Sequence, residues 1–238
     1  MKRKLCSLAS VVITLLTLSP PALAGDTASL LKEGGHTLSL ELKFSRKEQN
    51  PLQRVLSFLE VGPNGYATGF LVDDDLMITA YHVVSGDLSA SKKAQLGFGA
   101  KDQLEVKVYV NGCQATLLKA DEEADIALLR VCRYSKQIDV PTFQATLSKD
   151  EKLLLIARPH GGRMVRQGIF YGPYMTRGVE YWSAKLDGRD GYSGSPVYNH
   201  KAELVGVFSG YDWSKKLAVI SPGARAQKLL QDYLDSTK

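Results

Sequence analysis

The chain has 238 residues, of which 44% are hydrophobic and 23% charged, and its formal net charge is +5 at pH 7. This composition suits a soluble globular protein with a sizeable core, organised as one domain of two lobes or as two small domains. The basic residues are scattered and form no arm or stripe, which argues against a nucleic-acid partner.

Residues 1–24 have the pattern of a secretory signal peptide. A basic start precedes an apolar run at residues 5–18, and Ala22-Leu23-Ala24 provides a small-residue cleavage site. Cleavage after Ala24 removes three cations and no acids, which lowers the formal net charge from +5 to +2. An uncleaved anchor is the alternative, but the apolar run is shorter than a bilayer span. We therefore expect an exported protein, periplasmic or extracellular, with no membrane span after cleavage.

Short predicted strands follow the leader. Residues 37–44 alternate strictly between polar and apolar side chains, which is the period of a half-buried strand. Residues 52–61 fit either a strand or a helix. Further strands are predicted at residues 67–72, 76–80, 104–110, 113–119, 126–131, 152–157, 166–171, 180–186, 196–199, 203–209 and 217–220. Repeated short strands at this spacing indicate an all-β sandwich or barrel.

The segment at residues 133–149 has few apolar runs, and we expect the boundary between two lobes within it, at residues 25–145 and 146–238. One helix is predicted at the end of the chain, with Ser221 as N-cap and Pro222 at the first helical position. Five apolar side chains then recur at helical spacing: Ala226, Leu229, Leu230, Tyr233 and Leu234. We expect this helix to pack back onto the second lobe.

The chain that remains after the leader has two cysteines, Cys113 and Cys132. An even pair in an exported protein favours a disulfide, with two buried free thiols as the alternative. The absence of further cysteines excludes a zinc ribbon. The acidic turn at residues 73–75 lacks the ligand spacing of a calcium loop, so no metal site is predicted.

The sequence Gly-Tyr-Ser-Gly-Ser-Pro at residues 191–196 is a candidate nucleophile turn. Glycines near Ser193 permit a tight turn that exposes its hydroxyl. The same turn can aim the backbone N–H groups of Gly191 and Ser193 at one point, as an oxyanion hole requires. A bland loop is the alternative, and the choice depends on whether the chain also supplies a base and an acid.

His82 and Asp125 are the candidates for these two roles. His82 follows an apolar strand, and Asp125 directly precedes one, so each is expected at the rim of a core. A buried carboxylate needs a partner, and a histidine held in one tautomer is such a partner. A core histidine without function is the alternative for His82. The other histidines are expected at the surface: His36, His160 and His200.

These motifs, in the order His, Asp, Ser, resemble those of chymotrypsin-like (trypsin-fold) serine proteases. Residues 79–84, Thr-Ala-Tyr-His-Val-Val, resemble the family's Thr-Ala-Ala-His motif, and residues 124–129 resemble its Asp-Ile-Ala-Leu motif. Residues 191–196 resemble Gly-Asp-Ser-Gly-Gly-Pro, and residues 67–72 resemble the Gly-Thr-Gly-Phe strand of the bacterial Deg-type branch. The resemblance implies two six-stranded antiparallel β-barrels with a C-terminal helix.

The resemblance also implies a serine endopeptidase that acts on a protein or peptide substrate without a cofactor. Ser193 would be the nucleophile, His82 the base and Asp125 the carboxylate that orients the base, with Gly191 and Ser193 as oxyanion donors. A non-catalytic binding module of the same fold and an acyl hydrolase acting on esters are the alternatives. The sequence does not specify an oligomeric state.

Two tyrosines depart from the family pattern. Tyr192 occupies the position of an aspartate that pairs with a new N-terminus in zymogen-derived members, which argues against that activation route here. Tyr81 replaces a small residue beside His82 and is expected to narrow the cleft.

Three residues match the substrate pocket of trypsin-type members. Asp187, six residues before Ser193, matches the carboxylate at the pocket base, and Ser209 and Gly210 match the pocket wall. This match implies cleavage after Lys or Arg. A side-chain pairing of Asp187 with the nearby Arg189 is the alternative.

Overall fold

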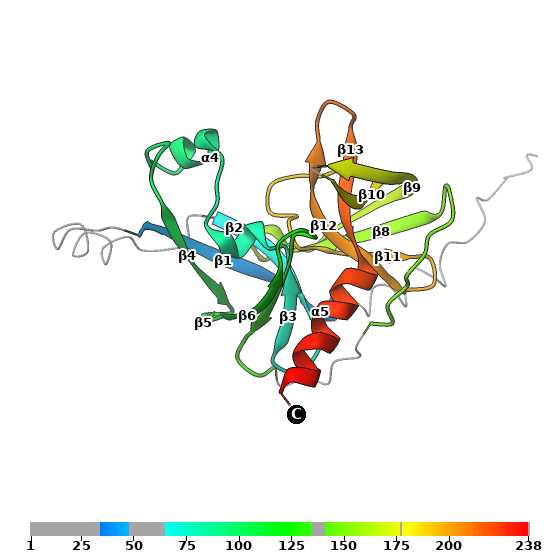
Figure 1. Cartoon of the computed structure of the whole chain (residues 1–238), viewed down its shortest axis with the longest axis horizontal. Helices are drawn as coiled ribbons and strands as arrows, with labels where there is room; N and C mark the ends of the chain where they lie inside the picture. The colour runs from blue at the N-terminus through cyan, green and yellow to red at the C-terminus, as the bar shows by residue number, and fades with distance from the viewer. Residues whose placement is uncertain (1–33, 48–64, 135–140, 177, 238) are drawn as a thin grey trace, which may run out of the picture.

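The computed structural model describes residues 34–47, 65–134, 141–176 and 178–237. Within these residues the chain forms two antiparallel sheets, which Figure 1 shows side by side with helix α5 (Gly223–Ser236) at their junction. No helix in this part of the chain is long and apolar enough to cross a membrane. The predicted leader and the ambiguous stretch at residues 52–61 lie outside the described residues.

The first sheet has seven strands in the order β5-β4-β1-β2-β3-β7-β6. Their bounds are β1 (Thr37–Arg46), β2 (Gly65–Leu71), β3 (Leu76–Thr79), β4 (Leu104–Val110), β5 (Cys113–Gln114), β6 (Thr116–Asp121) and β7 (Ile126–Arg130). In β1 the alternate residues Leu38, Leu40, Leu42 and Phe44 are buried, which confirms the strand predicted from the alternation.

This first half is an open sheet and not the closed six-stranded barrel that the resemblance implied. The stretch predicted as one strand at residues 113–119 is broken at Ala115 into β5 and β6, which lie at opposite edges of the sheet. The Ala115 N–H donates to the Val108 carbonyl at 2.8 Å, which holds this connection against β4. Because β5 is only two residues long, it offers little backbone with which to close a barrel.

A disulfide links β5 to the end of β7. Cys113 lies in β5, Cys132 follows β7, and their sulfur atoms are bonded, as the paired cysteines predicted. The backbone N–H of Cys132 also donates to Cys113 Sγ at 3.0 Å. The bond therefore joins two regions that no strand pairing connects directly.

Replacing Cys113 and Cys132 together with alanine is expected to lower the free energy of unfolding by about 3 kcal/mol. The bond closes a loop with a sequence separation of 19 residues, and in the chain-entropy model such a cross-link restricts the unfolded chain by about this amount. Urea unfolding of the oxidised wild type and of the double variant measures the difference. Equal midpoints and slopes would show that the bond adds nothing to stability.

The second sheet is a closed barrel of six strands in the order β10-β13-β12-β11-β8-β9. Its strands are β8 (Lys152–Ala157), β9 (Met164–Thr176), β10 (Val179–Lys185), β11 (Pro196–Asn199), β12 (Leu204–Asp212) and β13 (Leu217–Pro222). This half confirms the predicted six-stranded antiparallel barrel. Its interior is filled by apolar side chains that include Leu155, Trp182, Val197 and Ile220.

Helix α5 covers a hydrophobic cluster to which both sheets contribute. Phe70 and Ile78 of the first sheet and Ile156 of the second are fully buried there, and α5 adds Ala226 and Leu229. Its next apolar residues pack at the margin of the cluster, which confirms the predicted helical face: Leu230, Tyr233 and Leu234. The helix contacts β6 and β7 as well as β12 and β13, so it does not pack on the second lobe alone.

The helix begins differently from the prediction. Ser221 belongs to β13, and its hydroxyl donates to the Ala124 carbonyl in the turn between β6 and β7 and does not cap the helix. Pro222 is the N-cap, with the extended backbone angles φ −59° and ψ 136°, so it cannot be the first helical residue. The Ser221 hydroxyl ties the two sheets together close to Asp125.

Candidate active site

The sheet topology brings His82 and Asp125 together. β3 and β7 are neighbours with Thr79 opposite Ala127, so the residues just after β3 lie beside those just before β7. His82 begins the one-turn helix α3 (His82–Ser85), and Asp125 immediately precedes β7. The Tyr81 N–H donates to the Asp125 carbonyl at 3.1 Å, which fixes the two segments to each other.

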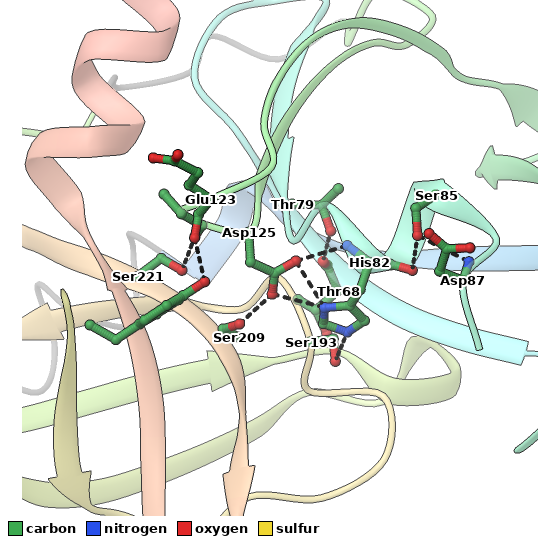
Figure 2. A network of polar contacts seen from close by, with 12 residues as sticks. Thr68, Thr79, His82, Ser85, Asp87, Glu123, Asp125, Ser193, Ser209 and Ser221 are labelled. Carbon is green, nitrogen blue, oxygen red and sulfur yellow. Dashed lines mark hydrogen bonds and ion pairs between the residues drawn. The ribbon is translucent and has the colours of Figure 1, made fainter. Parts of the chain in front are cut away.

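Ser193, His82 and Asp125 form a continuous chain of contacts (Figure 2). His82 Nε2 lies 2.8 Å from Ser193 Oγ, and His82 Nδ1 lies 2.8 Å from Asp125 Oδ2. The carboxylate can only accept, so the ring proton belongs on Nδ1, and Nε2 accepts from the Ser193 hydroxyl. This arrangement places a base at the nucleophile and an acceptor behind the base.

Three donors hold the Asp125 carboxylate. Besides the His82 ring, the His82 backbone N–H donates to Oδ1 at 2.8 Å, and the Ser209 hydroxyl donates to Oδ2. The Asp125 side chain is 14% exposed, and its backbone adopts a left-handed φ of 55°. From the sequence, Ser209 was predicted only as part of a pocket wall. Its contact with Asp125, drawn in Figure 2, was not predicted, because the two residues lie 84 positions apart in the chain.

The turn around Ser193 depends on its two glycines. Gly191 and Gly194 have φ values of 85° and 83°, in the left-handed region that other residues rarely adopt. The Gly194 N–H donates to the Phe208 carbonyl at 2.8 Å. Among the described residues, nothing accepts the N–H of Gly191 or of Ser193, so both donors remain for a developing oxyanion.

Thr68 in β2 holds this turn from the opposite sheet. Its backbone N–H donates to the Ser193 carbonyl at 2.9 Å, and its hydroxyl donates to the Gly191 carbonyl at 2.8 Å. The hydroxyl also accepts from the Arg158 N–H at 3.0 Å, and the Thr68 carbonyl accepts from the Thr79 hydroxyl at 2.8 Å. The sequence motif at residues 67–72 pointed to this strand, but not to the contact with the turn.

The two unusual tyrosines lie outside the reacting geometry. Tyr192 is fully buried in the core of the second barrel, where its ring packs edge-on against Phe208 and beneath the Arg166 guanidinium. Packing thus anchors the residue beside Ser193. Tyr81 does not narrow the cavity: its hydroxyl donates to Glu122 at 3.0 Å, and this hydrogen bond raises the pKa of Tyr81.

A cavity of about 770 Å³ extends from Ser193 between the two sheets. Gly188, Phe208, Gly210, Tyr211 and Trp213 line it on the side of the second barrel. Leu42, Phe44, Tyr66, Leu88 and Leu96 line it on the side of the first sheet. An ion pair between Lys92 and Asp190, 3.0 Å apart, connects the two sides.

Asp187 is not part of the cavity lining, whereas Ser209 and Gly210 are. The Asp187 carboxylate lies 3.2 Å from the Arg189 guanidinium and 3.8 Å from that of Arg166. The structure thus contains the ion pair between Asp187 and Arg189, which was the alternative to a role of Asp187 at the base of the substrate pocket.

The other histidines differ in their surroundings. His200 and His160 are exposed, as predicted, and the His160 ring lies 3.9 Å from that of Tyr66 at the cavity wall. His36 contradicts the prediction, because it is only 6% exposed. It precedes the start of β1, where Thr37 is also fully buried.

Comparison with known proteins gives one family and one fold. The family described as the trypsin-like peptidase domain matches residues 67–207, more than half of the chain. An inactive form of Rv3671c from M. tuberculosis H37Rv, carrying a serine-to-alanine substitution, is similar in structure with a TM-score of 0.57. It is 16% identical, and the match covers 92% of this chain and 95% of that chain, so the likeness concerns the fold. A search of curated proteins found no match.

Proposed function

Because the chain belongs to the trypsin-like peptidase family, we propose that it is a serine endopeptidase that hydrolyses peptide bonds of proteins or peptides. The observation that carries the proposal is the unbroken series of contacts from Ser193 Oγ through both nitrogens of His82 to Asp125. A nucleophile, a base and an orienting carboxylate within hydrogen-bond distance are the geometry that acyl transfer requires.

The reaction follows from these contacts. Ser193 Oγ attacks the peptide carbonyl carbon while His82 Nε2 takes the hydroxyl proton, and Asp125 stabilises the charged ring. The oxyanion accepts from the N–H groups of Gly191 and Ser193, each worth about 3 kcal/mol in such a site. His82 returns the proton to the leaving amine as the C–N bond breaks, which leaves an acyl ester on Ser193. Water, activated by His82, then releases the acid and restores the serine.

We further propose that the enzyme acts outside the cytoplasm, in a periplasm or in the extracellular medium. The signal-peptide pattern of residues 1–24 supports this location. The disulfide between Cys113 and Cys132 supports it independently, because disulfides persist mainly in oxidising compartments. Mass spectrometry of the protein from an exporting host would place the new N-terminus at Gly25; a retained leader would contradict the proposal.

The function is tested by hydrolysis of an unfolded protein and of matched peptide amides and esters, with Ser193→Ala as control. We expect the wild type to cleave internal peptide bonds and the variant to cleave none. Cleavage of the esters but not of the amides would show that the protein is an acyl hydrolase and not a peptidase. No turnover of either substrate class would favour a binding module that has kept the fold.

Thr68→Val is expected to lower kcat about tenfold and to leave KM nearly unchanged. Valine keeps the shape but removes the hydroxyl that holds the Gly191 carbonyl, so the oxyanion donors lose alignment without loss of substrate contacts; one hydrogen bond is worth about this factor. Thr68→Ser, which keeps the hydroxyl, should restore kcat. Equal kcat losses in both variants would assign Thr68 to packing alone.

A further inference from the structure

The substrate pocket beside Ser193 is bounded by two segments of the second barrel. Residues 188–191 lead into the nucleophile turn, and residues 208–211 run along the opposite wall, with both segments in the cavity lining. The resemblance to trypsin-type members, in which Ser209 and Gly210 match the pocket wall, implies that the side chain preceding the cleaved bond enters between these segments. Their spacing therefore decides which side chains fit.

The floor of this pocket is closed by aromatic side chains. A methyl group added to Gly188 would lie 2.7 Å from Phe208 Cζ and 2.8 Å from Tyr211 Cδ2. The segments 188–191 and 208–211 are therefore in contact at Gly188. Phe208 is 2% exposed and is held by Tyr192 beneath it, so its ring cannot move aside without disturbing the core. At Gly210, in contrast, an added methyl group would meet no atom within 4 Å, so the pocket is open at its rim.

Asp87 lines the cavity on the side of the first sheet, and the two acidic residues nearest the pocket walls, Asp187 and Asp190, are both paired with cations. Asp187 lies outside the cavity lining and is shared between Arg166 and Arg189. Asp190 lines the cavity but pairs with Lys92. A Lys or Arg side chain would therefore meet an apolar floor and would have to compete with Arg166, Arg189 and Lys92 for these two carboxylates.

We propose, building on the proposed peptidase function, that the enzyme cleaves after small uncharged aliphatic residues such as Ala and Val, with Phe208 and Tyr211 determining this specificity. A short side chain fits above the aromatic floor at the open rim beside Gly210. Longer aliphatic and aromatic side chains exceed the depth that Phe208 and Tyr211 leave. Asp187, although it stands at the sequence position of a pocket carboxylate, has no part in the selection.

The test uses fluorogenic peptide amides that differ only in the residue before the cleaved bond: Ala, Val, Leu, Phe, Lys and Arg. For the wild type we expect kcat/KM for Ala and Val to exceed that for Lys and Arg at least about 100-fold. Tyr211→Ala deepens the pocket and should raise kcat/KM for Leu and Phe, relative to Ala, about tenfold. Asp187→Asn should leave the ranking of the six peptides unchanged.

Preferred cleavage after Lys or Arg, lost in Asp187→Asn, would overturn this inference while the peptidase function stands. An unaltered ranking in a folded Tyr211→Ala variant would remove Tyr211 from the specificity. If Tyr211→Ala does not fold, the order of kcat/KM among the six peptides for the wild type and for Asp187→Asn still tests the proposed preference. Absence of cleavage together with absence of fluorophosphonate labelling at Ser193 would reject the proposed function and this inference with it.

Discussion

Asp125→Asn is expected to lower kcat about 10⁴-fold at neutral pH while the protein remains folded. Oδ1 of Asp125 accepts the His82 backbone N–H, so an asparagine in this position would retain its oxygen there and turn its NH₂ group toward Nδ1. The ring proton would then move to Nε2, and His82 could no longer accept the proton of Ser193. The loss thus comes from the wrong tautomer as well as from the lost charge.

The matched control for this variant is Glu123→Gln, which removes a carboxylate two residues away on the same loop. The Glu123 side chain is 76% exposed, and its carboxylate lies 3.7 Å from the Arg225 guanidinium. We expect its kcat to equal that of the wild type, and steady-state kinetics of both variants on one peptide give the comparison. A kcat for Asp125→Asn within tenfold of the wild type would show that His82 does not depend on Asp125.

Gly194→Ala is expected to destabilise the protein by about 3 kcal/mol or more and to abolish hydrolysis. Its φ of 83° is strained for alanine, and the new methyl carbon would lie 2.2 Å from both the Thr68 carbonyl oxygen and the Thr79 hydroxyl. These two groups are hydrogen-bonded to each other, and Thr68 also holds the nucleophile turn through its N–H and its hydroxyl, so they cannot yield without displacing Ser193.

Gly210→Ala provides the control for stability, because Gly210 has no left-handed φ and its added methyl group meets no atom within 4 Å. Its free energy of unfolding should lie within about 0.5 kcal/mol of that of the wild type, as for an ordinary surface substitution. Urea unfolding of both variants measures the contrast. Similar stabilities for the two alanine variants would contradict the close packing of the nucleophile turn.

Local pattern was sufficient for most strands. The apolar runs at residues 152–157 and 196–199 predicted β8 and β11 at their observed bounds, because burial on both faces leaves a continuous hydrophobic signal in the sequence. The break at Ala115 was not predicted, since it depends on a hydrogen bond to Val108 across the sheet. The open first half depends likewise on which strands pair across the sheet, and the local sequence pattern does not specify this pairing.

The sequence predicted which three residues form the candidate site, but not the contacts that hold them in place. His82, Asp125 and Ser193 are each ambiguous alone, and their order in the chain suggested that they meet. The supporting contacts of Thr68 and Ser209 could not be foreseen, because each joins segments more than 80 residues apart. The spacing of Asp187 from Ser193 suits a pocket base, whereas its nearest partner in the structure is an arginine two residues away.

The central claim is that Ser193 is the nucleophile of a serine endopeptidase. Reaction with a fluorophosphonate, followed by mass spectrometry of the digested protein, tests it most directly. We predict one adduct per chain, on the peptide containing Ser193, with labelling abolished in folded Ser193→Ala and strongly slowed in Asp125→Asn. An unmodified Ser193 in the reacted wild type, or undiminished labelling of Ser193→Ala, would contradict the account.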